Sequence, residues 1–155
     1  MAKRSAGILP YRRHGNAWQV LLVHPGGPFW IRKDDGAWSI AKGEYSEPET
    51  GLRAALREFR EETGFDLAGP FHALTPVRLK SGKVVEAWAT PVDLDTSAFR
   101  SNMFELEHPK GSGVIQRFPE VDRVEWFDLA TAQRKIHAGQ LGLLRELQRI
   151  VGCTI

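Results

Sequence analysis

The segment between Glu47 and Thr63 constrains the fold of this chain of 155 residues more than any other stretch. Its apolar residues recur three or four positions apart, the spacing that places side chains on one face of an α-helix. These residues are Leu52, Ala55, Leu56 and Phe59. Pro48 suits the first turn, and Gly64 suits a C-cap. We therefore predict a helix over residues 47–63 with one face turned toward a core.

The same helix gathers acidic side chains on one patch. Glu58 stands three residues before Glu61 and four before Glu62, so the three carboxylates project together. Because like charges repel, a cation among them is expected, and hard oxygen ligands suit Mg²⁺ or Mn²⁺. The alternative is a solvated helix face with ion pairs at four-residue spacing, such as Arg57 with Glu61. For a glutamate-rich helix taken alone, the solvated face is the commoner case.

The order of residues around the helix favours the metal site. The pattern is Gly, five residues, Glu, seven residues, Arg-Glu, a bulky apolar residue, one residue, Glu-Glu, one residue, Gly and a bulky apolar residue. The residues that fill it are Gly43, Glu49, Arg57, Glu58, Phe59, Glu61, Glu62, Gly64 and Phe65. This stretch resembles the Nudix box of the MutT-like Nudix hydrolases, and every specified position matches.

The resemblance implies a magnesium-dependent enzyme, with Mn²⁺ as a substitute ion, that cuts a diphosphate linkage in a nucleotide-like substrate. Divalent cations neutralise charge on the phosphate oxygens and lower the pKa of bound water. The implied ligands are Glu58, Glu61, Glu62 and a backbone carbonyl near Lys42 and Gly43.

The resemblance also implies supporting roles for other residues of the box. Arg57 and Glu49 would orient the carboxylates, and Glu61 is one candidate for the general base. Two positions depart from the family, because Ala41 stands where many relatives have proline and Pro48 where glycine is usual. Neither departure removes a ligand, but both affect the loop around Lys42.

A second stretch, Phe118–Phe127, is similar to the Pro-Glu-apolar segment of Nudix enzymes that cut dinucleoside polyphosphates or RNA 5′ ends. The resemblance implies that Glu120 is an extra metal ligand or base, and the alternative is an exposed residue at the start of a strand. Glu125 and Glu107 are the second and third candidates for this role.

Residues before the box are candidates for binding substrate. Trp30 could stack on a base, although an aromatic residue in a small domain more often packs in the core. Arg32, Lys33 and Lys42 could bind phosphates, or could be solvated loop charges. The preferred substrate class is a dinucleoside polyphosphate, followed by a nucleoside triphosphate and then an RNA 5′ end. From another class of protein, the rival is a catalytically silent Nudix-fold module that senses a nucleotide.

The charge balance and the cysteine content exclude other classes. The net charge is +2, from 21 basic and 19 acidic residues without a basic tract, so duplex DNA is not an expected partner. The start of the chain does not resemble a signal peptide, and no run of residues is long and apolar enough for a membrane span. Cys153 is not an expected nucleophile, and the five histidines show no metal spacing. We expect a cytoplasmic protein, a monomer or homodimer, with one domain over residues 1–155.

Strand patterns flank the predicted helix on both sides. Residues 5–11 and 18–24 predict a hairpin, residues 37–40 a short strand, residues 77–79 and 84–92 a second hairpin, and residues 121–127 a further strand. A helical stretch over residues 128–151 is expected to divide at Gly139. Together these elements predict an α/β fold in which a mixed sheet lies between helical layers.

Overall fold

The computed structural model describes residues 3–152, so Cys153 lies outside the described residues. The strands are β1 (Arg4–His14), β2 (Ala17–Pro25), β3 (Ala41–Tyr45), β4 (His72–Ala73), β5 (Val77–Arg78), β6 (Val84–Pro91), β7 (Met103–Glu107), β8 (Ile115–Pro119) and β9 (Val121–Asp128). The helices are α1 (Gly51–Thr63), α2 (Leu129–Lys135) and α3 (Leu141–Val151), with 3₁₀ turns η1 (Thr96–Ala98) and η2 (Ala138–Gln140). None of the described helices is long and apolar enough to cross a membrane.

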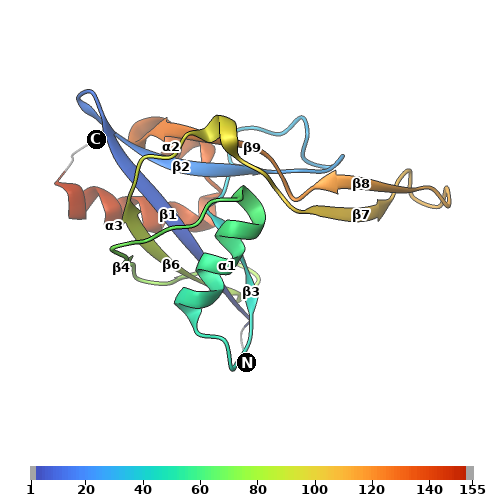
Figure 1. The fold of residues 1–155 in the computed structure, drawn as a ribbon, viewed down its shortest axis with the longest axis horizontal. Coiled ribbons are helices and arrows are strands. Elements are labelled where there is room, and N and C mark those ends of the chain that lie inside the picture. The colour runs from blue at the N-terminus through green and yellow to red at the C-terminus, as the bar shows by residue number, and fades with distance from the viewer. Residues whose placement is uncertain (1–2, 153–155) are drawn as a thin grey trace.

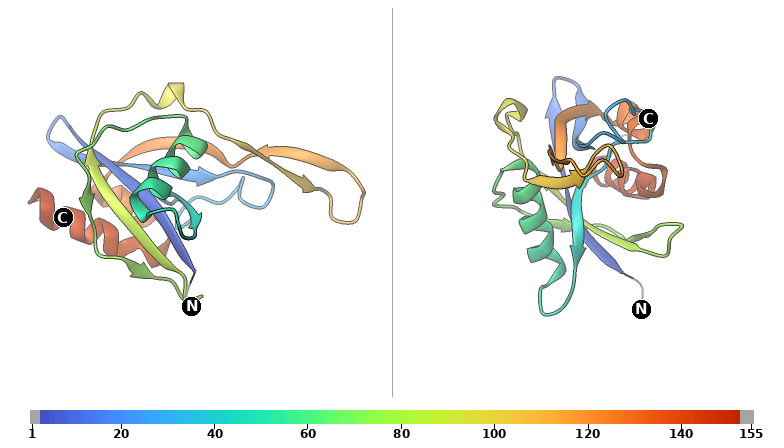
Figure 2. Two further views of the ribbon diagram at one scale, coloured as in Figure 1. Left: turned by 60° about the horizontal axis from the view of Figure 1, so that its bottom comes forward. Right: turned by 90° about the vertical axis from the view of Figure 1, so that its right-hand side faces the viewer.

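A mixed sheet forms the centre of the fold. Its strands follow the order β4-β6-β1-β2-β9, with β3 paired to β1 and β5 paired to β6. Strand β1 is parallel to β6 and antiparallel to β2 and β3. Helix α1 covers one face, and α2 and α3 cover the other (Figures 1 and 2). The predicted α/β architecture, with a mixed sheet between helical layers, is confirmed.

Two apolar clusters hold these layers together. On one face, Ala54, Ala55 and Phe59 of α1 are fully buried against β1 and β2. On the other face, Leu143 and Leu144 of α3 pack in a cluster with Trp38 and strands β1, β2 and β6. The buried face of α1 is thus the apolar face predicted from its spacing, and its opposite face is free to carry charge.

Several element boundaries differ from the prediction. Helix α1 begins at Gly51 rather than at 47, because Thr50 is the N-cap and its Oγ1 accepts a hydrogen bond from the Arg53 N–H at 3.4 Å. Gly64 ends the helix as predicted, with a left-handed φ of 82° that favours glycine. The predicted strand over residues 37–40 is wrong, since this segment makes only isolated bridges and β3 follows it.

The C-terminal stretch divides as predicted, because Gly139 lies in the 3₁₀ turn η2 between α2 and α3. Helix α2 already ends before Ile136, which is extended, buried and bridged to Trp38. The hairpin β7–β8 was not predicted. It forms a separate two-stranded sheet that projects from the body of the molecule (Figure 1).

Candidate active site

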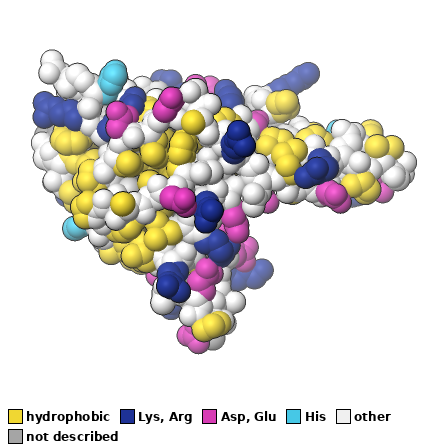
Figure 3. Space-filling view, in the orientation of Figure 1, with side chains coloured by type: hydrophobic (Ala, Val, Ile, Leu, Met, Phe, Trp, Pro, Cys, Tyr) yellow, Lys and Arg dark blue, Asp and Glu magenta, His cyan; other side chains and the backbone are white. Residues whose placement is uncertain are grey.

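A guanidinium group organises the acidic face of α1. Arg57 makes a forked contact with Glu49, through Nε to Oε2 at 2.8 Å and Nη2 to Oε1 at 2.9 Å. Its Nη1 also donates to Glu58 at 2.8 Å and to Glu61 at 3.4 Å. Figure 3 shows acidic and basic side chains interleaved over this part of the surface. Arg57 therefore holds three carboxylates in one arrangement, two of which are predicted metal ligands.

Glu62, the third predicted ligand, faces a more enclosed environment. Its Oε2 is buried and has no hydrogen-bond partner among residues 3–152. Burial, followed by repulsion from Glu58 and Glu120, raises the pKa of Glu62 to about 8, although Lys42 opposes the shift. Burial also raises the pKa of Glu58, against the attraction of Arg57. The ionised forms of Glu58 and Glu62 are therefore poorly stabilised by solvent, and a nearby cation would favour them.

Strand β3, which precedes α1, approaches these carboxylates closely. A Cβ added to Gly43 would lie 2.0 Å from the Glu58 Cδ, so only glycine lets this carboxyl group rest against the strand backbone. Next to it, Lys42 is half-buried, and burial followed by repulsion from Lys83 lowers the pKa of its ammonium group. Attraction to Glu62 opposes that shift, so the Lys42 ammonium group lies close enough to the box carboxylates to interact with them electrostatically.

Glu120, the first candidate in the second stretch, lies near the carboxylates of α1. It influences the pKa of both Glu58 and Glu62. Backbone hydrogen bonds tie it to α1 through Asn102, which accepts from Glu120 N and donates to Glu61 O, both at 2.8 Å. The two other candidates for this role, Glu125 and Glu107, lie on other parts of the fold. Glu125 is exposed on β9, and Glu107 accepts from Gly111 N at 2.7 Å in the β7–β8 turn.

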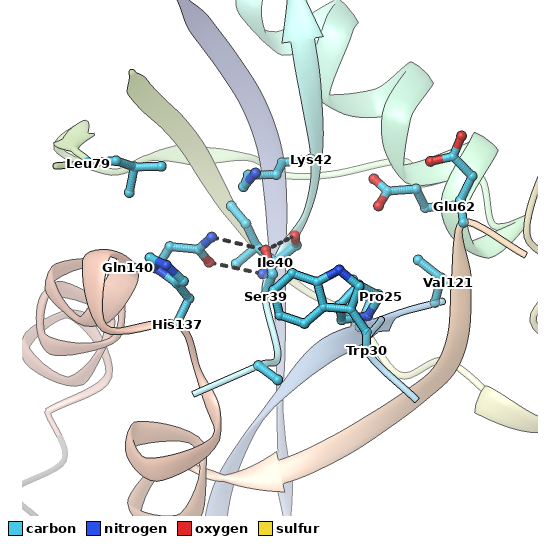
Figure 4. A pocket seen from close by; sticks show the side chains of 13 residues that line it. Pro25, Trp30, Ser39, Ile40, Lys42, Glu62, Leu79, Val121, His137 and Gln140 are labelled. Carbon is cyan, nitrogen blue, oxygen red and sulfur yellow. Dashed lines mark hydrogen bonds between the residues drawn. The ribbon is translucent and has the colours of Figure 1, made fainter. Parts of the chain in front are cut away.

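A cavity of about 320 Å³ opens beside these groups, and we call it the catalytic cavity. Figure 4 shows Trp30 at its mouth, with Lys42 and Glu62 across from the indole ring, and Glu120 also lines it. Of the four predicted substrate-binding residues, Trp30 and Lys42 line this cavity. Arg32 and Lys33 instead line a second hollow on the other side of their loop.

The inner end of the cavity has polar groups that the sequence did not indicate. Gln140 donates from Nε2 to Ser39 Oγ at 3.0 Å, and its Oε1 accepts from Ile40 N at 3.1 Å (Figure 4). His137 also lines the cavity. These residues lie about a hundred positions apart in the chain, so no local pattern could have shown that they share a pocket.

A buried histidine anchors the loop that carries Trp30. His24 is fully buried, with Nδ1 2.7 Å from Asp122 Oδ1 and Nε2 2.6 Å from the Lys33 carbonyl oxygen. Because a carbonyl can only accept, Nε2 is the donor of that bond. No role for His24 was expected from the sequence, where the signal was a histidine at the end of an apolar run in β2.

The chemical nature of these side chains suits a divalent cation. Carboxylate oxygens are the ligands that Mg²⁺ and Mn²⁺ prefer, and Glu62 offers a buried oxygen with no hydrogen-bond partner in the described part of the chain. Within residues 3–152, no three His, Cys, Asp or Glu side chains already stand close enough to hold an ion. Arg57 instead contacts Glu58 and Glu61, so cation binding requires these side chains to adjust.

Comparison with known proteins agrees with the fold and with the box. The family model of the NUDIX domain matches residues 1–147. No curated protein matches the chain.

Among solved structures, the NUDIX domain of Shewanella oneidensis NrtR complexed with ADP ribose is similar, with a TM-score of 0.69 and 19% identity over 97% of this chain and 89% of that one. A C. elegans Ap4A hydrolase binary complex has a TM-score of 0.67 and 22% identity over 97% and 98% of the two chains. A MutT/nudix family protein from Enterococcus faecalis has a TM-score of 0.65 and 16% identity over 98% of this chain and 63% of that one.

Proposed function

Because this chain belongs to the Nudix family of pyrophosphohydrolases, we propose that it cuts a diphosphate linkage in a dinucleoside polyphosphate. The observation that carries the proposal is the lining of the catalytic cavity. An indole ring (Trp30), an ammonium group (Lys42) and two carboxylates (Glu62 and Glu120) line one cavity. A base, phosphates and the groups that promote hydrolysis can therefore be held together.

Each residue has a part that follows from its contacts. A divalent cation held by Glu58, Glu61 and Glu62 would neutralise charge on the phosphate oxygens and make bound water more acidic. Arg57 keeps Glu58 and Glu61 oriented while Glu49 holds the other side of the guanidinium fork.

Lys42 and Trp30 position the substrate. The Lys42 ammonium group is suited to a phosphate oxygen near the box, and the indole ring offers a stacking surface at the cavity mouth. Glu61 and Glu120 are the candidates for the group that accepts the proton of the attacking water. A carboxylate in this role must lie within hydrogen-bond reach of that water. Glu120 lines the cavity, and Glu61 stands on α1 next to Glu62, which also lines it.

A nucleoside triphosphate is the second candidate substrate, because Lys42 could equally bind a terminal phosphate. The distinction lies in the far end of the molecule, which is a second nucleoside in one case and a bare phosphate in the other. Remote binding energy from a second nucleoside would help to position the scissile phosphate.

The test is a comparison of kcat/KM, with Mg²⁺ present, for a panel of nucleotides. The panel contains diadenosine tetraphosphate, ATP, GTP, ADP-ribose and a 5′-triphosphorylated RNA. We expect the highest kcat/KM for diadenosine tetraphosphate. A higher value for a triphosphate would overturn the proposed substrate, and a failure to cleave any of them would favour a silent nucleotide-sensing module.

The other sequence predictions remain part of this proposal. They are a single domain over residues 1–155, Mg²⁺ with Mn²⁺ as a substitute, a cytoplasmic location, a monomer or homodimer, and no binding of duplex DNA.

A further inference from the structure

A second hollow lies on the other side of the loop that carries Trp30. It is an open groove of about 670 Å³ between this loop and the projecting hairpin β7–β8, and we call it the hairpin groove. Its main lining residues are Phe29, Ile31, Arg32, Lys33, His108 and Phe118. None of them has a part in the chemistry described above, and Figure 3 shows apolar side chains gathered along the hairpin.

Aromatic rings form the apolar part of the groove. Phe29 stands edge-on to His108 with ring centroids 6.2 Å apart, and His108 stands edge-on to Phe118 at the same distance. Phe29 and Ile31 are 64% and 65% exposed. Single exposed apolar residues are ordinary, but neighbouring ones beside a hollow indicate a binding surface. Flat ligands with π-faces, such as nucleobases, suit such rings.

The charge of the groove favours an anionic ligand. Arg32 and Lys33 both line it. Asp122 is its acidic group, but the carboxylate of Asp122 lies 2.7 Å from His24 Nδ1 and 3.9 Å from Arg123 Nε. The aspartate is therefore already engaged, and the two cations remain available for phosphate.

The hairpin groove and the catalytic cavity share a wall. Trp30 lines the cavity while its neighbours Phe29 and Ile31 line the groove, and Glu120 lines the cavity while Pro119 lines the groove. A hydrogen bond of 2.9 Å from Gly26 N to Glu120 O joins the two segments of this wall. Lys33 lines the groove, yet its Nζ lies 4.8 Å from the centroid of a Trp30 ring.

We propose that the hairpin groove binds the second nucleoside of the substrate, with Phe29 as its stacking surface and Arg32 and Lys33 along the phosphate chain. This inference rests on the proposed function, which requires a substrate with a base at each end. One base lies against Trp30 in the catalytic cavity, the chain of phosphates crosses the shared wall near Glu120, and the other base lies in the groove. Arg32 and Lys33 then bind phosphate as predicted, but from the groove side.

The experiment compares diadenosine tetraphosphate with adenosine tetraphosphate, which has the same number of phosphates and one nucleoside fewer. Phe29→Ala should lower kcat/KM for the first compound at least about fivefold, the lower limit for loss of one stacked base. It should leave kcat/KM for the second compound unchanged. Phe29→Trp, which keeps an aromatic surface, should retain the preference for two nucleosides. Val114→Ala is the matched control, because Val114 is 51% exposed on the same hairpin without lining the groove.

Equilibrium binding of the two compounds in a Glu61→Gln background, with Mg²⁺ present, separates this inference from the proposed function. If diadenosine tetraphosphate binds more tightly than adenosine tetraphosphate, and Phe29→Ala abolishes this difference, the groove assignment is supported whether or not the enzyme turns the compound over. If the wild-type protein does not hydrolyse diadenosine tetraphosphate, the proposed function alone is overturned. If Phe29→Ala instead changes the binding of both compounds equally, that result would overturn the groove assignment alone. If Phe29→Ala also changed the sedimentation coefficient of the protein, the groove would be a contact between copies of the chain.

Discussion

The acidic face of α1 and the loop between β2 and β3 meet at one cavity but are built differently. The α1 face depends on contacts between residues close in the sequence, since within residues 3–152 Arg57 pairs only with Glu49, Glu58 and Glu61. The loop depends on distant strands, through His24 with Asp122 and Gly26 with Glu120. The comparison indicates that groups for chemistry are fixed locally, whereas groups that distinguish substrates are fixed by tertiary structure.

The largest expected effect comes from the α1 face. Glu62→Gln should reduce turnover by at least about 100-fold, because it removes a charged ligand at the reacting phosphate. Thermal unfolding in chelator should show a melting temperature no lower than wild type. The folded-state pKa of Glu62, about 8, lies above its reference value of 4.5, so the charged form is unfavourable in the folded protein and a neutral amide avoids this cost.

Glu105→Gln, on the exposed face of β7, is the control for this substitution and should retain wild-type turnover. Near wild-type turnover from Glu62→Gln would mean that this α1 carboxylate takes no part in the reaction. The contrast between a chemical α1 face and a substrate-binding loop would then fail.

Arg57→Ala tests whether the carboxylates must be held in place. Loss of the fork frees Glu49, Glu58 and Glu61, and we expect activity to fall about 10- to 100-fold, the usual effect of removing a partner of metal ligands. Higher Mg²⁺ should restore part of it. Arg53→Ala, on an exposed position of the same helix, is the matched control. Full activity of Arg57→Ala at ordinary Mg²⁺ would mean that the fork is only a surface ion-pair network.

On the loop side, Trp30→Ala should change substrate preference rather than chemistry. Trp30 is 39% exposed, so we expect the lower part of the range for a stacked base, a loss of about 5- to 10-fold in kcat/KM. The loss should fall mainly on KM. Steady-state kinetics with diadenosine tetraphosphate provides the measurement. A loss confined to kcat would mean that Trp30 acts in the chemical step rather than in substrate binding.

The smallest effect on catalysis should come from His24→Gln, which disturbs the loop at a distance from the reaction. We expect KM to rise about two- to fivefold with kcat nearly constant, and the free energy of unfolding to fall by about 1–3 kcal/mol as buried hydrogen bonds are lost. Kinetics and chemical denaturation measure the two changes. A fall in kcat without a rise in KM would show that His24 does not act through the loop.

The sequence indicated the α1 face well because its information is local. Spacing of three and four residues placed Glu58, Glu61 and Glu62 together, and Gly64 marked the end of the helix. The predicted start of α1 is wrong because Pro48 precedes the helix and Thr50 supplies the N-cap.

The cavity could not be predicted in the same way. Gln140 and Ser39 are 101 positions apart in the chain and are brought together only by the tertiary structure. The side of the loop on which Arg32 lies likewise depends on the hydrogen bond between Gly26 and Glu120. The β7–β8 hairpin did leave a signal. Apolar and polar residues alternate over Phe104–Glu107, and a turn-forming Pro-Lys-Gly-Ser-Gly run follows closely.

The central claim is that the α1 carboxylates form the metal-dependent reaction centre, and Mn²⁺ binding tests it most directly. Equilibrium titration of Mn²⁺, followed by the electron paramagnetic resonance of the free ion, should show at least about tenfold weaker binding to Glu62→Gln than to the wild type. Glu105→Gln should bind Mn²⁺ as the wild type does. Equal affinity of all three proteins would contradict the claim and place the metal elsewhere in the protein.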